Sequence, residues 1–225
     1  MQAIAENIWL QRHPLSLLGM KLGRNVVPIR LASGKVIVHS TAPFSQNDVD
    51  AIKQLGPVSW ILDATNFHDT YSVEGTEAFP DTTYLAPPGF PLGDRLEFTS
   101  LENPPPEWEE EIELITIGGM PKINETVFYH RPSRTLIVAD LLFHLSQDTD
   151  WWTRTGLRLL SGIREFPGNS RLFRAMIQDK EAFEQSLQEI LALDFKRIVV
   201  AHGVPITEEP KDALVSVFRS HGFAL

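Results

Sequence analysis

Three uninterrupted apolar runs limit the folds open to this chain more than any other feature of its sequence. They lie at residues 36–40 (VIVHS), 59–64 (SWILDA) and 197–203 (RIVVAHG). Strands with one face in water alternate in polarity, whereas continuous apolar runs are typical of strands covered on both faces. The chain is therefore predicted to form sheets that are buried on both sides, with helices packed on their outer faces.

The remaining segments predict a mixed order of strands and helices. Residues 45–56 are expected to form a helix, because Ser45 is a suitable N-cap, apolar residues recur at helical spacing and Gly56 ends the pattern. The Pro-rich segment 102–111 is expected to be a surface connection within one domain, residues 1–225. Strands are predicted at 6–14, 25–31, 34–40, 58–64, 83–89, 112–117, 126–132, 135–143 and 195–203, and further helices at 150–163, 170–177, 180–193 and 211–222.

The composition excludes several classes of function. A chain of 225 residues has the length of one large domain, and its net charge of -9 argues against a nucleic-acid partner. The absence of cysteine excludes disulfides, thiolate metal ligands and cysteine nucleophiles. Because no apolar run is long enough to span a bilayer and the N-terminus has no signal pattern, a cytoplasmic protein without a membrane partner is expected. The sequence says nothing of the oligomeric state.

Residues that can bind a metal or a proton stand at the ends of the predicted strands. The stretch DATNFHDTYS, residues 63–72, follows a buried strand and carries Asn66, His68 and Asp69. In sheets of this kind, sites form where loops leave the carboxyl ends of strands. We therefore expect a site built from residues at or just past such ends, which are His39, His68, Asp140 and His202.

These motifs together resemble the metallo-β-lactamase superfamily. SWILDATNFHD is similar to the histidine-rich loop of that family, LITIGGMPKINETVFYHRPSRTLIVADLLF to its next turn and strands, and RIVVAHG to its closing strand. The Asn66 and His68 loop, followed by AFPD and APPG, is most similar to a distant branch of the superfamily. The resemblance covers nearly the whole chain. It implies an α+β fold, an αββα sandwich of two facing mixed β-sheets with helices on the outer faces.

The resemblance also implies a set of metal ligands. His68 corresponds to the second histidine of the family's loop, Asp140 to its bridging aspartate and His202 to its last histidine. In intact relatives these residues belong to two ions, which in such sites lie about 3.5–4 Å apart. One ion at an intermediate position could therefore be held by all three residues.

Four positions depart from the family pattern. Asn66 stands in place of the first histidine, Thr70 and Tyr71 in place of the Asp-His pair, and Gly119 in place of the turn histidine. These changes remove the aspartate that usually activates water. The resemblance therefore implies a reduced site with a single ion.

The remaining ligands suit a hydrolytic centre. Such an ion needs about three protein ligands and an open position for water. Two histidines and a carboxylate favour zinc, with iron or manganese as alternatives. The expected function is metal-dependent hydrolysis of a small-molecule ester, lactone, thioester or phosphate. Asn66 would orient the substrate or stabilise an oxyanion, Asp69 is a second catalytic candidate, and Asp69 or His144 could complete the ligand set.

Each assignment has a structural alternative. His68 with Asp69 could form a loop that binds only backbone groups, Asp140 could cap the turn after its strand, and His202 could belong to a turn alone. For the whole chain the alternative is a catalytically silent, metal-free binding or scaffold protein, because a fold does not determine a function. Trp151 and Trp152 are expected to pack in the core or at a helix start, with the mouth of a pocket as the alternative.

Overall fold

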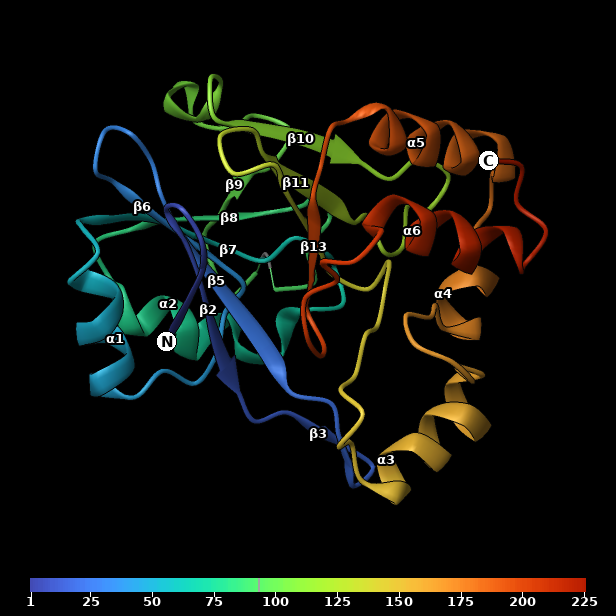
Figure 1. Ribbon diagram of the computed structural model, residues 1–225. Helices are drawn as coiled ribbons and strands as arrows, with labels where there is room; N and C mark the ends of the chain where they lie inside the picture. Colours follow the sequence, from blue (N-terminus) through green and yellow to red (C-terminus); the bar gives the residue numbers. More distant parts are fainter. Residues whose placement is uncertain (93) are drawn as a thin grey trace.

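Two β-sheets face each other at the centre of the computed structural model, which describes residues 1–92 and 94–225 (Figure 1). The larger sheet has seven strands in the order β1-β2-β5-β6-β7-β8-β9. Their bounds are Gln2–Ala5, Ile8–His13, Arg24–Arg30, Val36–His39, Val58–Leu62, Thr83–Ala86 and Thr99–Ser100. The smaller sheet has the order β10-β11-β12-β13, with bounds Ile112–Thr116, Thr126–His130, Thr135–Val138 and Arg197–Val200. A separate short hairpin joins β3 (Ser16–Leu17) to β4 (Met20–Lys21).

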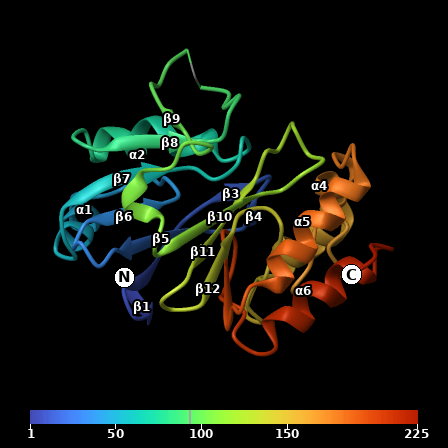
Figure 2. The ribbon, with the colours of Figure 1, turned by 90° about the horizontal axis from the view of Figure 1, so that it is seen from above.

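Helices cover the outer faces of both sheets, so that the layers run helix, sheet, sheet, helix (Figure 2). α1 (Gln46–Lys53) and α2 (Ser72–Ala78) lie on the larger sheet, and α5 (Lys180–Ala192) and α6 (Pro210–Arg219) on the smaller one. α3 (Trp151–Gly156) lies beside the β3–β4 hairpin, and α4 (Arg171–Ala175) follows it (Figure 1). The predicted αββα sandwich is confirmed. In the described part of the chain no helix combines the length and the apolar character that crossing a membrane requires.

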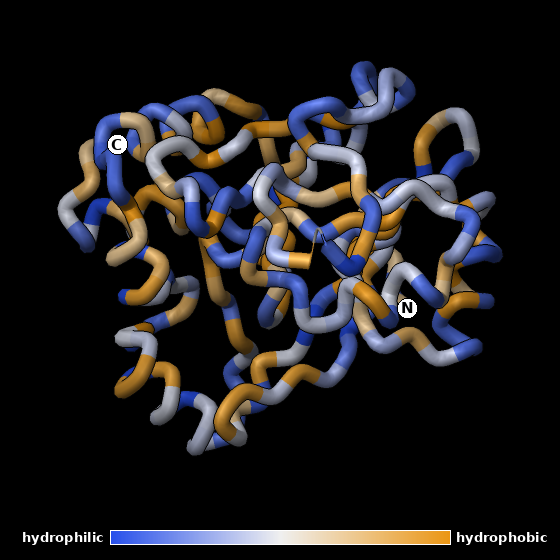
Figure 3. Tube along the Cα trace, turned by 180° about the vertical axis from the view of Figure 1, so that it is seen from behind, coloured by the Kyte–Doolittle hydropathy of each residue, from blue (hydrophilic) through white to orange (hydrophobic). Residues whose placement is uncertain are grey.

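The apolar runs noted in the sequence are buried on both faces, as predicted. Ile37, Trp60 and Val199 belong to the apolar layer between the two sheets. Val38 points the other way and packs in the layer beneath α1 and α2. Val200 packs in the layer beneath α5 and α6. Figure 3 shows hydrophobic stretches through the centre of the molecule and hydrophilic segments around it.

The helix that the sequence predicts from a capping residue is present in the structure. The helix predicted at 45–56 is α1, and Ser45 caps it in a reciprocal capping box with Asp48. α2, which follows the His68 loop through a 3₁₀ turn at Asp69–Tyr71, was not predicted.

The segment 150–163 differs from its prediction in two ways. It is an α-helix only as far as Gly156 and continues as a π-helical turn over Leu157–Ser161. Trp151 and Trp152 do stand at the start of this helix, but they are 74% and 47% exposed, so the expectation of core packing was wrong.

Candidate metal centre

Asp140 and His202 reach the same edge of the smaller sheet because their strands are parallel. Val138, the last residue of β12, is paired with Val200, the last residue of β13. Asp140 and His202 each follow their pair member by two residues, so they leave the sheet at the same level. The expectation that both stand at or just past the carboxyl ends of strands is met.

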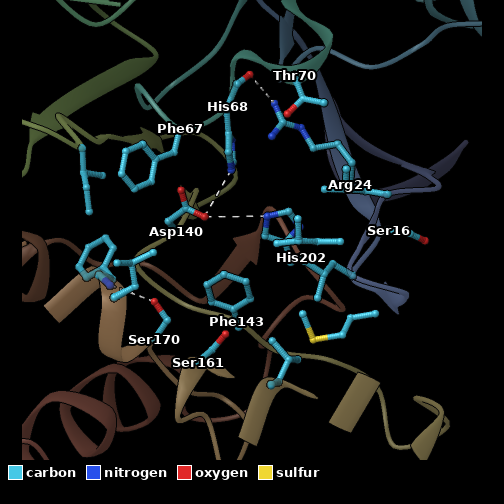
Figure 4. Close-up of a pocket in the computed structure, with 18 of the residues that line it drawn as sticks. Ser16, Arg24, Phe67, His68, Thr70, Asp140, Phe143, Ser161, Ser170 and His202 are labelled. Atoms are coloured by element: carbon cyan, nitrogen blue, oxygen red, sulfur yellow. Dashed lines mark hydrogen bonds and ion pairs between the residues drawn. The ribbon is translucent and has the colours of Figure 1, made fainter. Parts of the chain in front are cut away.

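His68 comes from the larger sheet, and backbone hydrogen bonds bring its loop across to the smaller one. The amide of Thr126 donates to the carbonyl of Ala64 at 2.8 Å, and the amide of Asn66 donates to the carbonyl of Ile123 at 2.8 Å. The loop after β7 is therefore tied to the start of β11. His68 consequently points toward the ends of β12 and β13 (Figure 4).

The three predicted ligands converge, with their ligand atoms directed at one another. His68 Nε2 lies 3.4 Å and His202 Nε2 lies 3.9 Å from Asp140 Oδ1. One ligand atom from each residue can be chosen so that all lie within 4.8 Å of one another. No described residue offers a hydrogen bond to either ring nitrogen of His68 or to Asp140 Oδ2, although these atoms are buried. Buried polar atoms normally have partners, so their convergence indicates a place for a ligand.

His202 is held in one tautomer and one orientation. Its Nδ1 lies 2.6 Å from the carbonyl oxygen of Gly23. Because a carbonyl oxygen can only accept, Nδ1 carries the hydrogen and Nε2 presents a lone pair toward Asp140. Phe143 stacks on the ring with centroids 5.1 Å apart. A histidine whose second nitrogen donates to a carbonyl is the arrangement typical of metal ligands.

Glu125, which was not predicted from the sequence, supports Asp140 from behind. Its fully buried carboxylate accepts hydrogen bonds from the backbone amides of Ala139, at 2.8 Å, and Asp140, at 2.9 Å. Burial, and then the charge of Asp140, raise the pKa of Glu125 to about 8. The one signal in the sequence is a charged residue at the start of the apolar strand NETVFYH.

A second buried group, the ion pair of Arg24 with Asp63, holds the His68 loop in place. Arg24 Nη2 donates to Asp63 Oδ1 at 2.7 Å and approaches the carbonyl oxygen of His68 at 3.5 Å. Asp63 accepts further hydrogen bonds from the amide and hydroxyl of Thr41, the hydroxyl of Ser72 and the hydroxyl of Tyr84. The pair also places a guanidinium at the edge of the site (Figure 4). The only sign of this ion pair in the sequence was an aspartate directly after an apolar strand.

The electrostatics of the site favour the metal-binding protonation states of Asp140 and His202. Burial alone would raise the pKa of Asp140, but the neighbouring His68 and then His202 lower it to about 2. Burial, and then the charge of His68, lower the pKa of His202 to about 4 against the opposing effect of Asp140. At neutral pH Asp140 is a carboxylate and His202 a neutral imidazole, which are the forms that ligate metal ions.

The other candidate residues do not join this group. Asn66 is buried and Asp69 is half-buried at the start of the 3₁₀ turn, but neither lines the cavity at the site. His144 Nδ1 lies 2.9 Å from a backbone carbonyl oxygen, that of Val204, and also lies outside the cavity. His39 is buried in the core edge-on to a phenylalanine ring. Among the residues described, the group with ligand geometry contains His68, Asp140 and His202 alone.

The glycine that replaces the turn histidine is required by the packing. Gly119 has φ of +73°, and a Cβ there would lie 2.1 Å from the carbonyl oxygen of Asp179. The carbonyl of Gly119 itself accepts a hydrogen bond from the amide of Gln178 at 2.8 Å. A histidine side chain therefore cannot occupy this position without displacing the chain. Thr70 and Tyr71 line the cavity in place of an Asp-His pair.

A cavity of about 410 Å³ opens at the three converging residues. Together with Arg24, they form what we call its floor (Figure 4). This volume is in the range of sites for small molecules. Most of the remaining lining comes from the β3–β4 hairpin, the His68 loop and the segment from α3 to α4, and Ile123 and Phe143 complete it.

Comparison with known proteins identifies the fold. No protein-family model and no curated protein sequence matches this chain. A metallo-beta-lactamase from Pontibacter korlensis aligns over 97% of both chains with a TM-score of 0.64 and 12% identity. The DIM-1 metallo-beta-lactamase aligns over 98% of this chain and 97% of its own, with a TM-score of 0.64 and 17% identity. TMB-1 aligns over 98% and 96%, with a TM-score of 0.66 and 16% identity. The chain has the metallo-β-lactamase fold, and at this level of identity the likeness is one of fold alone.

Proposed function

We propose that this protein is a metal-dependent hydrolase that holds one divalent ion between His68, Asp140 and His202. One observation supports the proposal most directly. His202 Nε2, which carries a lone pair, faces the Asp140 carboxylate at 3.9 Å in a buried site. Two acceptors in that arrangement repel each other, and a cation between them would convert the repulsion into attraction. Three protein ligands also match the number usual for catalytic ions, which leave a position open for water.

The donor atoms favour zinc. Two imidazoles and one carboxylate are a donor set typical of catalytic zinc, and they also accept iron(II) or manganese. The polypeptide contains no cysteine, so no thiolate narrows the choice of ion further.

The residues around the ligands would position the reaction. A bound ion would supply a Lewis acid that makes water nucleophilic at neutral pH and polarises a substrate carbonyl. Glu125 keeps Asp140 in place through its backbone amide, and the Gly23 carbonyl keeps His202 in the required tautomer. Arg24 is the only lysine or arginine in the described cavity lining, and its guanidinium group would face a substrate oxygen. Asn66 is given no role here, because it does not line the cavity.

The decisive experiment combines metal analysis with a substrate screen. Protein purified without chelator should contain one ion per chain, and a screen of esters, thioesters, lactones and phosphodiesters should find turnover that a chelator removes. Asp140→Asn and His68→Ala should each lose both the ion and the turnover while circular dichroism stays native. His221→Ala serves as the matched control, because His221 is exposed and lies outside the cavity.

A second candidate function, that of a metal-free binding or scaffold protein, is favoured by the lost family ligands. Gly119 cannot be replaced by histidine without displacing the chain, and Asn66 and Thr70 stand where the family has a histidine and an aspartate. Protein that contains no ion and shows no turnover in the screen would favour this function over the hydrolase. Turnover that survives both Asp140→Asn and His68→Ala would place the chemistry elsewhere.

A further inference from the structure

Most of the exposed large apolar side chains lie on segments that contribute to the lining of the cavity. Among the described residues, the large hydrophobic side chains that are most exposed are Met1, Leu17, Leu18, Phe67, Trp151, Trp152, Leu159, Leu160 and Leu172. All except Met1 belong to the β3–β4 hairpin, the His68 loop or the segment 151–172, and each of these segments contributes to the cavity lining. Single exposed hydrophobic residues are normal, but such a concentration in one region marks a binding surface.

The hairpin and α3 form a continuous apolar border. Trp152 Nε1 donates to the carbonyl oxygen of Leu18 at 3.1 Å, which joins the tip of the hairpin to α3. Beneath them, Met20 and Leu157 pack in a small apolar cluster of their own. In Figure 1 the hairpin and α3 lie side by side at one end of the molecule, away from the facing sheets.

The border continues into the cavity as an apolar wall. Leu17, Phe67 and Leu172 line the cavity although they are 57%, 42% and 60% exposed, so a ligand in the cavity would cover them. Deeper in, the lining includes the buried Leu22 and Ile123. All charged residues of the described lining, and both of its histidines, are on the floor. The cavity is therefore charged at one end, and the rest of its lining is uncharged, with apolar side chains and the hydroxyl groups of Ser16, Thr70, Ser161 and Ser170 (Figure 4).

We propose that the cavity takes an unbranched aliphatic acyl chain, with its carbonyl group at the floor and its methylene groups along Leu17, Phe67 and Leu172. The substrate class is then an ester or thioester of an aliphatic acid. This rests on the proposed hydrolase function. In the reaction, the oxygen of water bonds to the carbonyl carbon and the C–O or C–S bond breaks. The alcohol or thiol leaves with one proton, and the acid releases the other.

An uncharged ester fits the lining better than a phosphate does. Arg24 is the only lysine or arginine of the described lining, and its charge is already balanced by Asp63 at 2.7 Å. A phosphate group would meet the Asp140 carboxylate with no free cationic side chain of the described lining to offset it, so that only the bound ion would compensate its charge. A neutral carbonyl oxygen carries no such cost.

The test uses binding, so that it does not depend on turnover. Linear primary amides from butanamide to octanamide, which carry the acyl group without a charge, are titrated into the protein as purified and followed by calorimetry. Each methylene group that leaves water should strengthen binding about fourfold. Leu172→Gln and, separately, Leu17→Gln should flatten this dependence on chain length. Leu160→Gln, at 57% exposure on the same segment but outside the cavity lining, should leave it unchanged.

Several results would overturn the proposal. Affinity that does not depend on chain length, or no binding at any length, would refute the proposed acyl-binding site. An equal loss in Leu172→Gln and Leu160→Gln, together with an equal loss of binding to phosphatidylcholine vesicles, would instead assign these exposed leucines to a lipid-binding surface. The two proposals fail separately. Metal-free protein that keeps the chain-length dependence would refute the hydrolase alone, and metal-dependent turnover with a flat dependence would refute the acyl site alone.

Discussion

Removing the Asp63 carboxylate should destabilise the protein more than removing any exposed charge. Asp63 is fully buried and paired with Arg24, whose side chain is 4% exposed. Breaking a buried ion pair by deleting one partner costs about 3–5 kcal/mol, because the other charge is left buried without compensation. Asp63→Ala would also strand the hydroxyl donors of Ser72 and Tyr84, so the upper part of that range is expected.

Such a loss is large against the whole stability of a domain, which is about 5–15 kcal/mol. Urea unfolding followed by circular dichroism measures it. With a dependence on urea of about 2 kcal/mol per molar, the midpoint should fall by about 2 M. Asp63→Asn should recover part of the loss, since an amide oxygen still accepts from the hydroxyl groups but leaves the Arg24 charge unbalanced.

The matched control is Glu113→Ala. It breaks the Arg131–Glu113 pair, whose side chains are 43% and 31% exposed, and pairs of that kind contribute about 0–1 kcal/mol. Because Arg24 also approaches the His68 carbonyl at 3.5 Å, Asp63→Asn should in addition weaken metal binding. If Asp63→Ala shifted the midpoint no more than Glu113→Ala, the pair could not be what holds the loop.

Three further predictions follow from the site and the core. If an ion is bound, a chelator should lower the melting temperature, because free metal at a hundred times its Kd stabilises the folded state by about 2.7 kcal/mol. His202→Ala should abolish this response in thermal scans. Gly119→His should destabilise the fold by more than about 1 kcal/mol, because its Cβ would lie 2.1 Å from the Asp179 carbonyl oxygen; an unchanged urea midpoint would contradict this. Burial lowers the pKa of His130 from 6.5 to about 4, so the folded state binds fewer protons than the unfolded state. Its contribution to stability is complete above pH 6.5 and is lost as the pH falls toward 4, and His130→Asn should lose less stability over that interval in urea titrations.

The sequence alone determined the layers and the positions of the three ligands along the chain. Continuous apolar runs are typical of strands covered on both faces, and Ser45 before a helical pattern of apolar residues marks a helix start, because these signals act within a few residues. The strand ends singled out His39, His68, Asp140 and His202, and the resemblance to the metallo-β-lactamase superfamily implied His68, Asp140 and His202 as the ligands. These are local properties, which is why the sequence is sufficient for them.

Only the tertiary structure decided which of these residues meet. Asp140 and His202 come together through the pairing of Val138 with Val200, and His68 joins them through the hydrogen bond between Thr126 and Ala64. Arg24 was missed for the same reason, because its partner Asp63 lies 39 residues away in the chain. Glu125 was missed because its partners are backbone amides, which no side-chain pattern reveals.

The exposed apolar residues near the cavity also show what the sequence could not predict. An apolar pair such as Trp151 and Trp152 predicts burial, but hydrophobicity in a sequence does not specify what covers a side chain. In this fold the β3–β4 hairpin and α3 extend beyond the two sheets, and within the described part of the chain both tryptophans remain exposed. Whether an apolar residue enters the core or borders a cavity depends on contacts between distant segments, and those exist only once the chain has folded.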